Sequence, residues 1–75
     1  MNIEGAKKLL LEKLKKMSND EYPLTWVGEL MKETPEEYYI EGNIHNDEME
    51  PNEGALPFAI NKTTGYVRMV GYQPH

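Results

Sequence analysis

The sequence predicts an α+β domain in which one N-terminal helix packs on a four-stranded antiparallel meander, in the order α-β-β-β-β. Three observations predict this class. Apolar residues near the start recur at helical spacing, and the later apolar runs alternate with a period of two. Pro, Gly and Asn separate these runs, as turn residues do. With 75 residues, the chain has room for one domain, residues 1–75, with a small core.

The first element is expected to be a helix over residues 2–17. Asn2 is suited to cap its first turn, and five lysines lie mostly outside its apolar face. We expect this amphipathic helix to cover the sheet; the alternative is a helix that binds an anionic membrane or a calmodulin-like partner. The apolar residues that define its face lie three or four positions apart: Ile3, Ala6, Leu10, Leu14 and Met17.

Residues 24–33 fit either a strand or a second helix. Apolar residues at spacings of three would share one helical face, whereas Thr25, Trp26 and Val27 are β-forming residues in succession. A turn signal with a proline at residues 34–37 leads into another strand-like run. Two strands around a short turn make a hairpin, so we predict a strand over 24–33.

The second strand is predicted over residues 37–45, and its two faces differ. One face is apolar, and the other is polar and carries Tyr39, Glu41, Asn43 and His45. A sheet with such strands is covered on one side only. Residues 46–54 then lack periodicity and carry four acidic residues. They are expected to form a long loop, and a solvated acidic loop is favoured over a Ca²⁺ or Mg²⁺ site because the spacing is not that of an EF-hand.

A final hairpin joins predicted strands at residues 56–61 and 65–72. Apolar residues alternate on both runs, which flank a short polar loop that ends at Gly65. Gly at this position suits a turn closed by a left-handed residue. With the helix across the concave face of a curved sheet, the whole arrangement is of the cystatin-like type.

Charge is unevenly placed along the chain. Residues 1–19 carry five lysines and two glutamates, net +3, whereas residues 20–53 carry eleven acidic residues and one lysine, net −10. Such an acidic middle argues against direct nucleic-acid binding. A solvated face that keeps the protein soluble is the favoured interpretation of this charge, and a cationic partner is the alternative. The chain has no cysteine and its N-terminus does not resemble a signal peptide, so we expect a cytoplasmic protein without membrane association.

No residue pattern predicts catalysis, a metal or a cofactor. His45 and His75 are the two histidines, and Ser18, the single serine, has no base nearby in the sequence. Thirteen acidic residues do not define a catalytic pair without a cleft. We therefore expect a binding protein and not an enzyme.

Three segments carry a resemblance to a known family. They are the helix segment 6–12 (AKKLLLE), the strand pair 29–33 (ELMKE) and 38–40 (YYI), and the hairpin segment 57–67 (PFAINKTTGYV). In these the chain resembles the YrhB-like family of small bacterial immunity proteins. The family carries a Trp in its second strand, where this chain has Tyr38 and Tyr39. The resemblance implies a protein that neutralises a toxin by binding it.

Charge and resemblance together lead to one functional hypothesis and one alternative. The hypothesis is an immunity or inhibitor protein that binds a basic site on a toxin or enzyme. Its candidate contact residues are acidic: Glu36, Glu37, Asp47, Glu48, Glu50 and Glu53. The alternative is a phage or mobile-element assembly protein that self-associates, as a homodimer for example, through its exposed sheet face. That face is expected to carry Tyr39, Tyr66, Arg68 and Tyr72.

Overall fold

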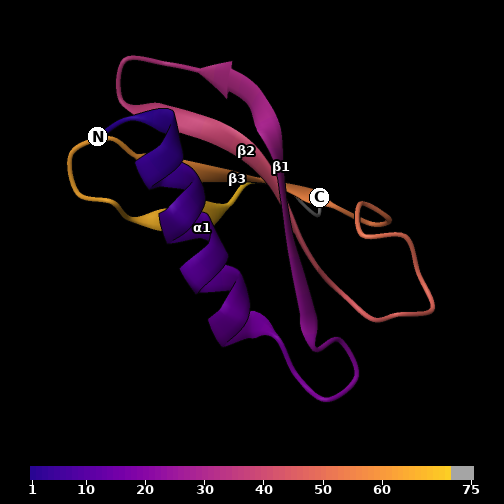
Figure 1. The fold of residues 1–75 in the computed structure, drawn as a ribbon. Coiled ribbons are helices and arrows are strands. Elements are labelled where there is room, and N and C mark those ends of the chain that lie inside the picture. The colour runs from indigo at the N-terminus through magenta and orange to yellow at the C-terminus, as the bar shows by residue number, and fades with distance from the viewer. Residues whose placement is uncertain (72–75) are drawn as a thin grey trace, which may run out of the picture.

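The computed structural model describes residues 1–71 and confirms the predicted fold class. One helix, α1 (Ile3–Met17), precedes four strands: β1 (Leu24–Glu33), β2 (Glu37–His45), β3 (Leu56–Asn61) and β4 (Val67–Met69). The strands form one sheet in the order β1-β2-β3-β4, and every neighbouring pair is antiparallel. Figure 1 shows α1 crossing one face of this curved sheet.

Helix α1 begins and ends at polar caps. The side chain of Asn2 accepts a hydrogen bond of 2.8 Å from the Gly5 N–H. At the other end the Ser18 N–H donates to the Leu14 carbonyl, and the Ser18 hydroxyl donates to the Lys15 carbonyl. These bonds satisfy backbone groups that a helix end leaves free. The helix therefore begins at Ile3, one residue after the predicted start, and ends at Met17 as predicted.

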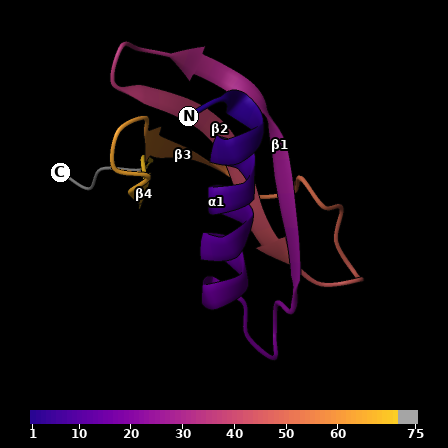
Figure 2. The ribbon, with the colours of Figure 1, turned by 60° about the vertical axis from the view of Figure 1, so that its left-hand side comes forward.

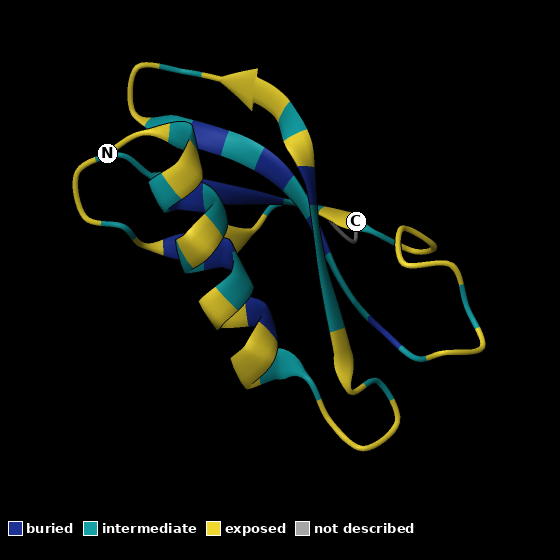
Figure 3. Cartoon of the chain, viewed as in Figure 1, coloured by how far each residue is buried: buried dark blue, intermediate teal, exposed yellow. Residues whose placement is uncertain are grey.

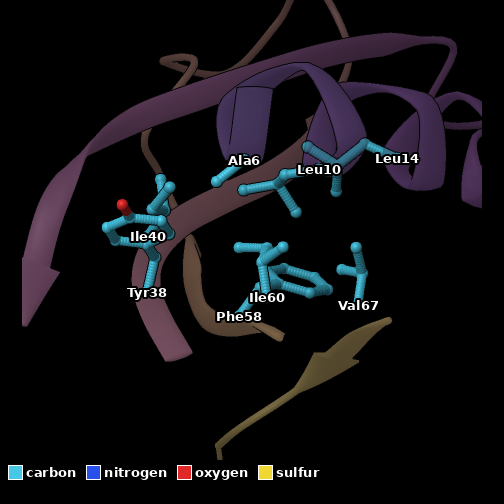
Figure 4. Packing of buried hydrophobic residues seen from close by; sticks show 8 residues of the cluster. All are labelled: Ala6, Leu10, Leu14, Tyr38, Ile40, Phe58, Ile60 and Val67. Carbon is cyan, nitrogen blue, oxygen red and sulfur yellow. The ribbon is translucent and has the colours of Figure 1, made fainter. Parts of the chain in front are cut away.

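The core lies between α1 and the helix-facing side of the sheet. Its buried residues alternate along β2 and β3, as predicted, and meet the buried stripe of α1 (Figures 3 and 4). Gly42 lets the two layers approach, because a Cβ there would lie 3.1 Å from side-chain atoms of both Leu14 and Phe58. The buried core residues are Ala6, Leu10, Leu14, Tyr38, Ile40, Phe58, Ile60 and Val67.

Residues 24–33 form strand β1, in agreement with the favoured prediction. The pairing of β1 with β2 is irregular at two places, between Val27 and Leu30 and between Leu30 and Lys32. Trp26 lies on the face opposite the helix, which we call the open face, and its ring covers Gly28. A Cβ on Gly28 would lie only 2.6 Å from the Trp26 ring. The glycine therefore makes room for the indole beside the irregular pairing.

The β3–β4 hairpin closes as the sequence predicts, but β4 is shorter than expected. Gly65 has φ of 76° and donates its N–H to the Asn61 carbonyl, while the Asn61 side chain accepts from two threonine N–H groups of the turn. Residues 65–72 were predicted as a strand, whereas β4 covers only Val67–Met69. Gly65 and Tyr66 lie in the connection between β3 and β4, and Val70 and Gly71 follow the strand.

Among residues 1–71 no helix is long and apolar enough to cross a lipid bilayer.

Candidate functional site

The acidic loop, residues 46–54, carries a concentrated negative charge. Its four acidic side chains are all exposed: Asp47, Glu48, Glu50 and Glu53. Among residues 1–71 the ion pairs involve Glu29, Glu33 and Glu37, and the acidic loop contributes to none of them. Four like charges therefore face solvent close together in sequence, without internal neutralisation.

Consecutive hydrogen-bonded turns give the acidic loop a defined course. The Asn46 side chain accepts from the Glu48 N–H at 3.0 Å. The Glu53 N–H donates to the Glu50 carbonyl at 3.0 Å, and the Ala55 N–H donates to the Asn52 carbonyl at 3.1 Å. These local bonds hold the backbone that carries the carboxylates.

Asn43 anchors the acidic loop to the open face of the sheet. Its side-chain amide donates to the Pro51 carbonyl at 2.9 Å and to the Glu53 carbonyl at 2.7 Å. One side chain of β2 therefore holds two points of the loop. Sequence reasoning placed Asn43 on the polar face but did not assign it this role. The signal available was an amide on that face, two residues before the strand ends.

His45 and Asn46 hold the start of the acidic loop. The His45 side chain is buried, although the alternation placed it on the polar face, and its Nδ1 lies 3.1 Å from the Asn46 carbonyl. Because a carbonyl only accepts, this contact is a hydrogen bond in the tautomer that carries its proton on Nδ1. The Asn46 side chain in turn donates to the Glu21 carbonyl at 3.3 Å. This bond ties the loop to the segment between α1 and β1.

Glu36 lies at the opposite end of β2 from the acidic loop. It stands in the β1–β2 turn, where it is exposed and its carbonyl accepts from the Lys62 N–H at 2.8 Å. The 9 residues of β2 separate the two places, a span of roughly 26 Å at the rise of a strand. Figure 1 shows the turn and the loop at opposite ends of the sheet. The structure therefore does not bring Glu36 together with the loop carboxylates.

Glu37 makes internal contacts on the open face. Arg68 donates from Nε to one carboxylate oxygen at 3.2 Å and from Nη2 to the other at 2.9 Å. The Tyr39 hydroxyl also donates to Glu37, at 3.0 Å, and the Lys32 ammonium lies 5.3 Å from the centre of the Tyr39 ring. The hydrogen bonds from Arg68, more than any other contact, hold the pKa of Glu37 below its ordinary value.

The predicted aromatic sheet face is only partly assembled. Tyr39 and Arg68 lie close together, and both are engaged with Glu37. Tyr66 is 66% exposed and lies beside α1, at the start of β4. Tyr72, like His75, is outside the described residues. The open face therefore presents a hydrogen-bonded polar group and not a continuous aromatic surface in residues 1–71.

Within residues 1–71 no group of three or more His, Asp or Glu side chains is arranged to hold a metal ion. The carboxylates of the acidic loop are exposed, and they do not form such a group.

Comparison of the chain with protein-family models, with curated proteins and with solved structures finds no match. The resemblance to the YrhB-like immunity proteins therefore stays a prediction from the sequence.

Proposed function

We propose that this chain is a non-enzymatic protein-binding module, an immunity or inhibitor protein whose acidic loop binds and neutralises a basic site on a toxin or enzyme. One observation carries the proposal. The loop presents four exposed carboxylates on a backbone that hydrogen bonds hold in place, and no cation within residues 1–71 pairs with them.

Physical chemistry favours this use of the loop. Clustered charge of one sign raises the rate of encounter with a partner of the opposite sign and selects against partners of the same sign. A loop that is already ordered loses less conformational entropy on binding than a disordered one. The double anchor from Asn43 supplies this order.

Glu36 and Glu37 have different places in the proposal. Glu36 is exposed and free to contact a partner that extends along the sheet from the acidic loop. Glu37 would have to leave Arg68 and Tyr39 to do so. We therefore assign Glu37 to holding the open face together and not to binding.

The test begins with capture of a partner from host lysate by the tagged protein at low and at high salt, followed by identification. Association of the purified partner is then measured with the triple variant Glu48→Lys, Glu50→Lys, Glu53→Lys. We expect association to slow by roughly tenfold or more at low salt and to lose most of its salt dependence.

A matched control carries the same charge change elsewhere. Glu4→Lys, Glu12→Lys, Asp20→Lys replaces three exposed acidic residues outside the acidic loop. We expect this variant to retain most of the association rate. Equal loss in both triple variants, or no loss in either, would contradict the proposed role of the loop.

Self-association through the sheet is the second candidate function, and it has less support. Its motivating residues Tyr39 and Arg68 are bound within the chain. The observation in its favour is apolar exposure along the sheet edge β1, where Leu24 is 44% and Met31 is 52% exposed. Sedimentation equilibrium at high protein concentration tests it, because a monomer there excludes a stable dimer.

A further inference from the structure

The outer edge of β4 carries backbone groups that have no partner among residues 1–71. The Asn61 N–H donates to the Tyr66 carbonyl and the Val70 N–H donates to the Pro57 carbonyl. Bonded pairs alternate along an antiparallel ladder, so Ala59 and Arg68 form the bonded pair between these two. The N–H and C=O groups of Val67 and Met69 therefore point away from β3, toward the edge of the sheet.

A groove runs beside this edge, between β4 and α1. It consists of two adjoining hollows of about 270 and 310 Å³ that share Lys13, Tyr66 and Val67. Figure 2 shows β4 set apart from α1, on the other side of the helix from β1. Met69 is 49% exposed at the groove, whose floor includes Met17 and Phe58. We call the free edge of β4 and these hollows the β4 groove.

Positive charge borders the β4 groove. Lys13 and Lys16 line it from α1, both are exposed, and neither takes part in the ion pairs found among residues 1–71. By contrast, Lys7 pairs with Glu29 and Lys62 pairs with Glu33. Arg68 also lines the groove, but its charge is paired with Glu37. One acidic residue, Glu12, stands among the lining residues.

We propose that the β4 groove binds an extended segment of a partner protein, which adds to the sheet beside β4 and carries acidic side chains toward Lys13 and Lys16. The backbone of the segment would pair with Val67 and Met69, as strands do when they extend a sheet. Alternate side chains of the added strand face α1, so acidic groups at these positions meet the two lysines. Apolar side chains at other positions on the same face of the added strand would pack on Met17 and Met69.

A second copy of the chain fits this groove less well than an acidic segment. Twofold pairing of β4 with β4 would place both helices on one side of a continuous sheet, with the axis between the two edges. Lys13 and Lys16 of the two copies would then approach each other, and like charges in such proximity repel. Charge complementarity therefore selects an acidic segment of another protein.

Amide hydrogen exchange of the full chain, followed by NMR, tests the proposal with two short blocked peptides. In one peptide valine alternates with glutamate, and in the other valine alternates with lysine. We expect the glutamate peptide to slow exchange at the Val67 and Met69 amides. The Arg68 amide, which already bonds to β3, should change little. Affinity for the lysine peptide should be lower by roughly tenfold or more.

Two charge variants decide whether the groove lysines select the peptide. Lys13→Glu, Lys16→Glu is expected to reverse the preference between the peptides. Lys8→Glu, Lys15→Glu makes the same charge change on exposed residues of α1 that do not line the β4 groove, and it should keep the preference. Met69→Pro removes one edge-facing N–H without removing a bond to β3, and it should weaken binding of the glutamate peptide.

Three outcomes would overturn the proposal. Equal binding of both peptides would show that charge does not select the segment. Protection at β1 in place of Val67 and Met69 would put the pairing edge on the other side of the sheet. Protection of these two amides without peptide, rising with protein concentration, would identify a second copy as the occupant.

Discussion

Glu37 and Arg68 form a two-bond ion pair that reaches from the first residue of β2 to β4, across β3 on the open face. The Arg68 Nη2 lies 2.9 Å from one Glu37 oxygen and its Nε lies 3.2 Å from the other. The pair runs diagonally across β3, because Arg68 lies opposite Ala59 whereas Glu37 lies opposite Asn61. Ala59 is fully buried although it belongs to the open face. The pair thus closes over a small residue and links the short edge strand to the centre of the sheet.

The Glu37–Arg68 pair predicts an acid-dependent loss of stability. Because the folded-state pKa of Glu37 lies below its ordinary value of 4.5, the ionised carboxylate stabilises the fold above that pH. The contribution is lost as the pH falls through the lower, folded-state pKa. We expect Glu37→Gln to be less stable than the parent chain at neutral pH, and the difference to shrink progressively as the pH falls below 4.5. Urea unfolding at several pH values measures it.

Lowering the pH changes the charge of the whole chain, so the difference in stability between Glu37→Gln and the parent chain is the informative quantity. Glu48→Gln serves as the control, because Glu48 is exposed in the acidic loop and outside the ion pairs among residues 1–71. Its stability should follow that of the parent chain at every pH. A gap between Glu37→Gln and the parent chain that stays constant as the pH falls well below 4.5 would contradict the assignment.

Local patterns were enough to predict much of the core, the order of the elements and the turn between β3 and β4. Alternation along β2 and β3 predicted that Ile40, Phe58 and Ile60 face the helix, and each is buried. Gly65 was predicted from turn chemistry and adopts the positive φ expected. These features depend on neighbours within a few residues, which is the range over which sequence periodicity is informative.

Relationships between distant residues could not be predicted in the same way. Glu37 and Arg68 are 31 residues apart, and they meet only because the registers of β2–β3 and β3–β4 bring them together. Sequence reasoning therefore grouped Glu37 with the acidic loop as a binding residue. It also placed His45 on an exposed face, where the structure has it buried beside Asn46. The contacts of Glu37 and the burial of His45 both depend on how strands and loops meet after folding.

The contact between Gly28 and the Trp26 ring predicts an intolerant position. In Gly28→Ala the new methyl group would lie 2.6 Å from the ring and 3.2 Å from the Glu41 Cβ, so the indole must move. We expect a loss of about 1–3 kcal/mol in the free energy of unfolding, as for overpacked sites. Urea unfolding followed by circular dichroism measures it.

A second background separates the ring contact from a backbone effect. When Trp26 is already replaced by Ala, Gly28→Ala should cost less than it does in the parent chain. An equal cost in both backgrounds would show that the Gly28 backbone, and not the ring, excludes a side chain.

Leu10 makes the domain sensitive to single core substitutions. Its side chain is fully buried between α1 and the sheet. Leu10→Ala should lower the free energy of unfolding by about 3 kcal/mol, through lost burial and the cavity left behind. For a domain of 75 residues the total is about 4–11 kcal/mol, so this one substitution should remove roughly a quarter to three quarters of the stability. Leu11, the next residue, is only half-buried, so Leu11→Ala should lower the free energy of unfolding by less than half as much.

Asn43 predicts a separation between the stability of the fold and the order of the acidic loop. Asn43→Ala removes two hydrogen bonds to the Pro51 and Glu53 carbonyls, on an exposed part of the sheet and outside the core. We expect global stability to fall by only about 1 kcal/mol, since hydrogen bonds at exposed sites contribute little net free energy. Amide exchange in residues 46–54 should accelerate much more than exchange in β2.

Asn52→Ala is the matched control, because Asn52 serves the loop through its backbone carbonyl, which this substitution keeps. If the proposed function is right, only Asn43→Ala should weaken binding of the basic partner, because only this variant loosens the carboxylates before they bind. Unchanged loop exchange in Asn43→Ala would mean that the turns alone hold the loop.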